Sequence, residues 1–168
     1  MLKLSLFLLV LSCQAALGSN WRPSERFMSA LRHIESSNGA FLYGDDGHSR
    51  GDFQMSEAAW IDVNAWRKTH KLARYSYDRY ALNPQINRLY AADYLSLLHN
   101  QLKKKLSRPP NSGELYAAYN MGLRQFARCG YRLDRVNALT LKKCRQIVGL
   151  LEAGEQVQAS GRRTGARI

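Results

Sequence analysis

Metal and cofactor motifs are missing from this sequence. It contains only three cysteines, and no two of them are spaced as a CxxC pair. The four histidines lie at positions 33, 48, 70 and 99, so no HxxxH spacing occurs. The glycines at positions 44, 47 and 51 form neither a GxxxxGK phosphate loop nor a GxGxxG element after a strand. We therefore expect this protein to use neither a metal ion nor a cofactor.

Acidic residues are scarce. The chain has 13 Asp and Glu against 25 Lys and Arg, which gives a formal net charge of +12 at pH 7. A positive charge of this size favours anionic partners, such as nucleic acid, acidic lipid headgroups or the anionic polymers of a cell envelope. The length of 168 residues suits a single domain with one core, and no internal repeat is evident.

Long apolar runs are confined to the N-terminus. Residues 1–18 have the features of a signal peptide, because Lys3 precedes an apolar run and small residues follow it. A second interpretation is a lipobox that ends at Cys13, which would become a lipidated N-terminus. Both interpretations predict export, to the periplasm or outside the cell, without a transmembrane segment. Export favours envelope polymers over nucleic acid as partners.

Two cysteines, Cys129 and Cys144, remain in the exported chain. An even number of cysteines in an oxidising compartment predicts one disulfide, and the alternative is two buried thiols. The disulfide would close a loop of the chain and stabilise the fold by about 3 kcal/mol.

Apolar residues recur at helical spacing through most of the chain. Ser56, Asn83 and Asn111 are good N-cap residues for three of the helices, and Glu114 completes a capping box with Asn111. Turn-forming residues between positions 38 and 51 predict a small hairpin after the first helix. We expect a mainly α, monomeric helical bundle over residues 19–152, with one small β-hairpin excursion. Residues 153–168 lack periodicity and predict a flexible basic tail.

Two carboxylates fall on the apolar faces of predicted helices. Glu35 lies close to Met28 and Leu31 on a helix that ends at about residue 35 or 36. Burial raises the pKa of a carboxyl, so Glu35 is a candidate general acid. The alternative is a helix-end glutamate that reaches water or pairs with an arginine. We expect Asp93 to be a structural carboxylate with a buried partner.

Three short motifs follow one another along the chain. They are Glu35-Ser36, the Gly-x-x-Gln segment Gly51-Asp52-Phe53-Gln54, and Ala118-Tyr119-Asn120-Met121-Gly122. In this order, over roughly residues 24–130, the chain resembles the lysozyme-like superfamily, in the branch of soluble lytic transglycosylases and goose-type lysozymes. The resemblance implies an α+β lysozyme-like fold and the peptidoglycan glycan strand as substrate.

The resemblance also implies roles for individual residues. Glu35 matches the acid that protonates the leaving oxygen of the MurNAc-GlcNAc β-1,4 bond, and Gln54 matches a residue that lines the glycan cleft. Tyr119 and Asn120 match residues that orient the acid and contact the sugar with the N-acetyl group, and Ser49 is a further contact to that sugar. Without the resemblance, these residues also have structural explanations. Ser49 can belong to a turn, Gln54 can cap the helix that begins at Ser56, and Tyr119 and Asn120 can close a helix before Gly122.

The sequence departs from the goose-type pattern just beyond Gln54. That pattern has an Asp there, whereas this chain has Met55-Ser56. Asp45 and Asp46 are the candidates for a second carboxylate, although Gly-Asp-Asp-Gly is also an ordinary turn. A lytic transglycosylase needs one carboxyl only, because the substrate's N-acetyl group and 6-hydroxyl do the rest. We therefore expect an exported lytic transglycosylase. The alternatives are a hydrolytic muramidase and a non-catalytic glycan-binding module.

Overall fold

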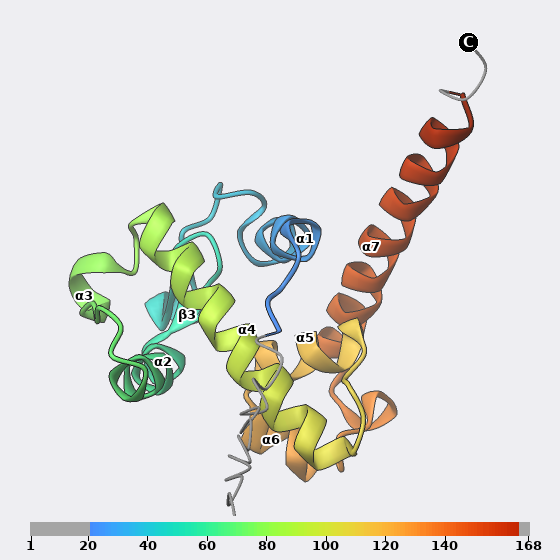
Figure 1. Cartoon of the computed structure of the whole chain (residues 1–168). Helices are drawn as coiled ribbons and strands as arrows, with labels where there is room; N and C mark the ends of the chain where they lie inside the picture. Colours follow the sequence, from blue (N-terminus) through green and yellow to red (C-terminus); the bar gives the residue numbers. More distant parts are fainter. Residues whose placement is uncertain (1–20, 165–168) are drawn as a thin grey trace, which may run out of the picture.

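The protein is mainly helical, with one small sheet after the first helix (Figure 1). The computed structural model describes residues 21–164, so the predicted signal peptide and Cys13 lie outside the described residues. The elements are, in order, α1 (Glu25–Ser36), β1 (Tyr43–Gly44), η1 (Asp45–Gly47), β2 (Ser49–Arg50), β3 (Met55–Ser56), α2 (Glu57–Thr69), α3 (Tyr77–Tyr80), α4 (Pro84–Leu106), α5 (Ser112–Met121), α6 (Leu123–Arg128), η2 (Leu133–Arg135) and α7 (Ala138–Thr164). The predicted mainly α fold with a small β-hairpin excursion is confirmed.

Helix α5 lies at the centre of the fold. Its residues from Gly113 to Tyr119 are all buried, and the helix packs against α4, α6 and α7. A helix that is covered on every side has few polar residues, which fits its Leu, Ala and Tyr content. The predicted capping box between Asn111 and Glu114 is present at its start. The helix ends at Met121, before Gly122, as its sequence predicts.

Side-chain caps fix where the other helices begin. The Ser56 hydroxyl accepts the Ala59 N–H at the start of α2, and the Asn83 side chain accepts the Ile86 N–H at the start of α4. Both caps confirm the prediction. Helix α1 ends at Ser36, also as predicted. The helix packs against α7.

The predicted hairpin is confirmed and continues into a third strand. β1 pairs antiparallel with β2, and β2 pairs antiparallel with β3. Sequence periodicity does not indicate this third strand, because two residues are too few to show alternation. Asp45 and Asp46 both have positive φ, at 48° and 54°, and turn the chain between β1 and β2.

Asp93 is a buried structural carboxylate, as predicted. Its side chain is 1% exposed, and its two oxygens accept hydrogen bonds from Arg67 of α2 and from Arg22 before α1. A buried carboxylate that lost such partners would destabilise the fold strongly. Asp93 therefore ties two other segments to α4.

The predicted disulfide is wrong. Cys129 and Cys144 are free thiols, and burial raises the pKa of Cys144 to about 11. The even number of cysteines carries no information on distance, whereas a disulfide needs Cα atoms within about 7 Å of each other.

The predicted end of the structured chain is also wrong. Helix α7 continues past residue 152 to Thr164 and extends away from the other elements (Figure 1). Glycine and arginine suggested an irregular tail, but alanine and glutamine in the same stretch are good helix formers. A helix that is already nucleated by packing adds further residues at low cost.

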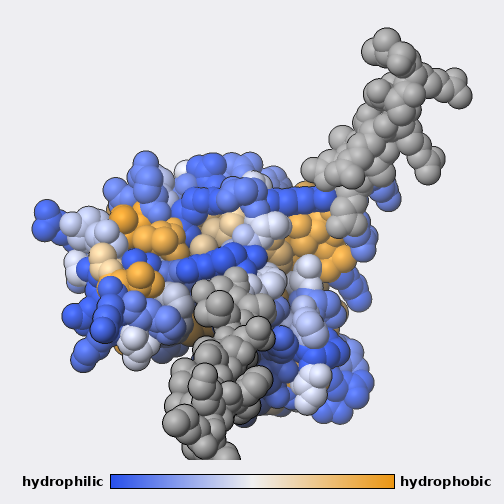
Figure 2. Space-filling model, in the orientation of Figure 1, coloured by the Kyte–Doolittle hydropathy of each residue, from blue (hydrophilic) through white to orange (hydrophobic). Residues whose placement is uncertain are grey.

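The surface in Figure 2 is mostly hydrophilic, with separate hydrophobic patches. None of the helices within residues 21–164 combines the length and the apolar character that a membrane span requires.

Candidate active site

Glu35 lies in the last turn of α1, with its side chain only 7% exposed. Its Oε1 accepts a hydrogen bond from the Tyr116 hydroxyl at 2.5 Å. Its Oε2 lies 3.9 Å from Nζ of Lys143. The carboxyl therefore meets side chains of two other helices, α5 and α7.

Burial raises the pKa of Glu35 above its ordinary value, because the charged form loses its hydration. The positive charge of Lys143 and the hydrogen bond from Tyr116 act in the opposite direction, and the negative charge of Asp45 raises the pKa further. The net direction is upward. Glu35 thus keeps its proton to higher pH than an exposed glutamate, as a general acid requires.

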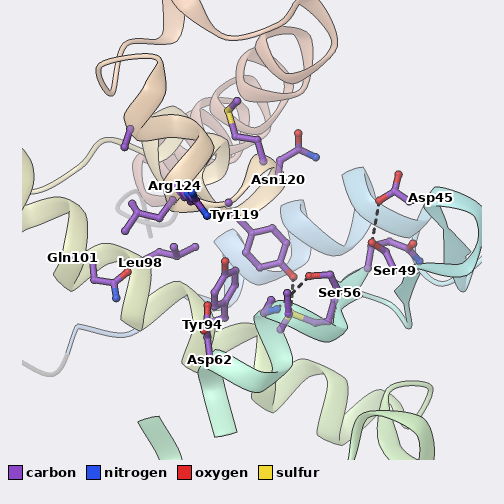
Figure 3. Close-up of a pocket in the computed structure, with 18 of the residues that line it drawn as sticks. Asp45, Ser49, Ser56, Asp62, Tyr94, Leu98, Gln101, Tyr119, Asn120 and Arg124 are labelled. Atoms are coloured by element: carbon purple, nitrogen blue, oxygen red, sulfur yellow. Dashed lines mark hydrogen bonds between the residues drawn. The ribbon is translucent and has the colours of Figure 1, made fainter. Parts of the chain in front are cut away.

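A cavity of about 140 Å³ opens beside this carboxyl. Its lining residues are Glu35, Gly44, Asp45, Ser49, Gln54, Tyr119, Asn120 and Lys143. The structure therefore brings Glu35 together with five other residues that the sequence singled out. Five of the lining residues also line a larger groove of about 620 Å³. Figure 3 shows that groove, with Asp45 and Ser49 at one side and Gln101 and Arg124 at another.

Only one of the two candidate second carboxylates reaches the site. Asp45 lines both cavities, and its Oδ2 accepts a hydrogen bond from the Ser49 hydroxyl at 3.0 Å. Asp46 is exposed and lines neither cavity.

Gln54 does not cap helix α2, since Ser56 does so. Its Nε2 donates to the carbonyl oxygens of Phe41 and Gly51, at 3.0 and 2.9 Å, which ties the loop to the small sheet. The φ of Gln54 is 45°, a value that non-glycine residues rarely adopt. Its Oε1 lies against Gly44, where a Cβ atom would clash.

Tyr119 and Asn120 line the cavity, but neither holds Glu35. The Tyr119 hydroxyl donates to the carbonyl oxygen of Phe53 at 2.6 Å, and Oδ1 of Asn120 accepts from the Thr140 hydroxyl at 2.9 Å. The residue that bonds the carboxyl is Tyr116, one helical turn before Tyr119. Neither Tyr119 nor Asn120 therefore has a hydrogen bond to Glu35 through which it could orient the carboxyl.

Sequence reasoning missed Tyr116 and Lys143. The spacing of Tyr116 and Tyr119 places them on one face of α5, which was a usable signal. Lys143 carried no signal, because a lysine on an amphipathic helix is most simply a solvated residue. The contact depends on how α7 packs against α1, which periodicity does not specify.

Residues Gly47 to Gly51 match the GxSxG pattern of serine hydrolases. That pattern requires a sharp turn from a strand into a helix, whereas Ser49 lies on β2 of a hairpin. Its hydroxyl donates to Asp45. The local structure gives no support for a nucleophilic serine.

Within residues 21–164, no group of three or more His, Cys, Asp or Glu side chains is arranged to hold a metal ion. The side chains that line the smaller cavity can supply acid–base chemistry by carboxyl groups and hydrogen bonds from polar groups. Comparison with protein-family models, with curated proteins and with solved structures finds no match.

Proposed function

We propose that this protein is an exported enzyme that cleaves the MurNAc-GlcNAc β-1,4 bond of peptidoglycan as a lytic transglycosylase. The observation that carries the proposal is the buried Glu35 carboxyl, which opens onto a cavity also lined by Gln54, Tyr119 and Asn120. These are the positions that match the three lysozyme-like motifs. The adjoining groove of about 620 Å³ offers room for sugars next to the scissile bond.

Glu35 serves first as acid and then as base. It gives its proton to the leaving glycosidic oxygen, and the bond from that oxygen to the anomeric carbon breaks. The N-acetyl group of the MurNAc residue that carries this anomeric carbon stabilises the positive charge there. The Glu35 carboxylate then takes the proton of the 6-hydroxyl, whose oxygen closes the 1,6-anhydro ring. The hydrogen bond from Tyr116 stabilises the carboxylate between these two steps.

Hydrolysis is the second candidate, and the position of Asp45 favours it. Asp45 lines the same cavity as Glu35 and is close enough to affect its pKa. A second carboxylate at such a site can activate water or stabilise the cationic sugar. Asp46 has no such position.

The products of digested sacculi distinguish the two reactions by mass spectrometry. A transglycosylase gives anhydromuramoyl products, and Asp45→Asn leaves them unchanged in kind. A hydrolase gives products heavier by one water, and Asp45→Asn reduces the rate by about 100-fold or more. Asp46→Asn is the matched control and keeps full activity in both cases.

Glu35→Gln tests the assignment of the acid. We expect this variant to fold, to bind sacculi and to lose cleavage by at least about 100-fold. Retained cleavage would place the acid elsewhere. If the unmodified protein sediments with sacculi but releases no product at all, the protein is a glycan-binding module.

A further inference from the structure

Among the residues that the structure describes, Lys143 is the one basic residue that lines the cavity of about 140 Å³. It lies in the second turn of α7, outside the part of the chain that resembles lysozyme-like proteins. Its side chain is 27% exposed, and Nζ lies 3.9 Å from Oε2 of Glu35. This separation is an ion-pair distance that is too long for a hydrogen bond.

The charged and titratable groups around the Glu35 carboxyl come from three other elements. Tyr116 of α5 bonds Oε1, Lys143 of α7 faces Oε2, and Asp45 of η1 approaches from the hairpin. Tyr119 of α5 is also near, but its hydroxyl donates to Phe53. Lys143 is therefore the group that can offset the negative charge that remains when Glu35 gives up its proton.

We propose that Lys143 is a positioning residue, whose ammonium group orients the Glu35 carboxyl and stabilises its ionised form during the reaction. The inference rests on the proposed function for its catalytic meaning, but its physical content is independent of any substrate. With Tyr116 on one oxygen and Lys143 beside the other, the carboxyl is held from two sides. Rotation of the carboxyl away from the leaving oxygen is thereby restricted.

Lys142 provides a matched control for this inference. It precedes Lys143 on the same helix and is exposed, and it does not line the cavity. Replacement of either lysine by methionine removes the same charge from α7. A general effect of net charge or of helix stability would therefore appear in both variants, whereas a specific effect on Glu35 would appear only in Lys143→Met.

The first measurement is a carbon-13 NMR titration of the Glu35 side-chain carboxyl, assigned by its loss in Glu35→Gln. We expect the midpoint to move to higher pH in Lys143→Met, because removal of a nearby cation disfavours the carboxylate. Lys143→Arg should restore the midpoint, and Lys142→Met should leave it unchanged. An unchanged midpoint in Lys143→Met, with the fold intact, would overturn the proposal.

The second measurement is the pH profile of kcat/KM on purified peptidoglycan. In Lys143→Met we expect the alkaline limb to move to higher pH, together with a loss of kcat of up to about 100-fold from misorientation. Lys143→Arg should recover most of this loss. Equal losses in Lys142→Met and Lys143→Met would indicate a structural role and overturn the proposal. If the NMR midpoint moves as expected in Lys143→Met but neither the original protein nor any variant cleaves peptidoglycan, the result counts against the proposed function alone.

Discussion

Two glutamates of this protein show how neighbouring groups decide what a carboxyl does. The hydrogen bonds from Arg108, at 2.8 and 2.6 Å, hold the pKa of Glu114 below its ordinary value. Glu35 is buried and has one hydroxyl donor and an ammonium group at 3.9 Å, so burial prevails and raises its pKa. The first glutamate caps a helix in its charged form, and the second keeps its proton to higher pH than an exposed glutamate.

The raised pKa of Glu35 has a consequence for stability. Above pH 4.5, its ordinary value, the folded chain binds more protons at this site than the unfolded chain. The contribution of Glu35 to stability is therefore fully present below that pH and is lost as pH rises through the folded-state pKa. Glu35→Gln has no such loss. We expect this variant to be as stable as the original chain at low pH and more stable at neutral pH, measured by urea unfolding.

Glu114→Gln serves as the control of opposite sign. Because the pKa of Glu114 is lowered in the fold, its stabilising effect is present above the unfolded value and is lost as pH falls. Its replacement should therefore destabilise the protein at neutral pH by about 1–3 kcal/mol. A Glu35→Gln variant that is less stable than the original chain at neutral pH would contradict the raised pKa.

At the scale of elements, the segment between β2 and β3 is held against α4 by Asn87. This side chain is fully buried, accepts the Phe53 N–H at 2.9 Å and donates to the carbonyl oxygens of Arg50 and Ala81. Gly51 has a φ of 81°, and a Cβ atom there would clash with Ala81 and Asn87. The close approach is possible because Gly51 has no side chain.

Two glycine substitutions separate this packing effect from backbone strain. Gly51→Ala should destabilise the fold by about 3 kcal/mol or more, since strain and a steric clash add. Gly47 has a φ of 88° with open space around it, so Gly47→Ala should cost only about 1 kcal/mol. Thermal unfolding measures both. Equal losses in the two variants would show that packing against Asn87 adds nothing.

The helices could be predicted from local sequence, whereas the contacts between elements could not. The caps at Ser56, Asn83 and Asn111 depend on residues within three positions, so the sequence indicates them directly. Nothing in the sequence distinguishes Asn87 from the other polar residues of its long helix, yet its three hydrogen bonds reach two other segments. The extension of α7 was missed because glycines obscured its helix-forming residues.

At the scale of the whole molecule, the candidate site is assembled from four segments. Glu35 comes from α1, Asp45 from the hairpin, Tyr116 from α5 and Lys143 from α7. The three motifs predicted that Glu35, Gln54 and Tyr119 would share a cleft, and the structure places them in one cavity. The motifs did not identify the two side chains that surround the carboxyl, because those contacts depend on helix packing.

The net charge of +12 and the largely hydrophilic surface lead to a prediction on binding (Figure 2). If anionic wall polymers contribute to affinity, salt should weaken it, because the Debye length falls from about 10 Å to about 3 Å between about 0.1 and about 1 M salt. Glu35→Gln, which leaves the wall intact, should sediment with sacculi at the lower salt and be released at least in part at the higher. Sacculi stripped of anionic polymers are the control and should show weaker binding with a smaller salt dependence, because the proposed glycan cleft then provides most of the affinity. Equal retention on intact sacculi at both salt concentrations would mean that the cleft, rather than the charge, determines binding.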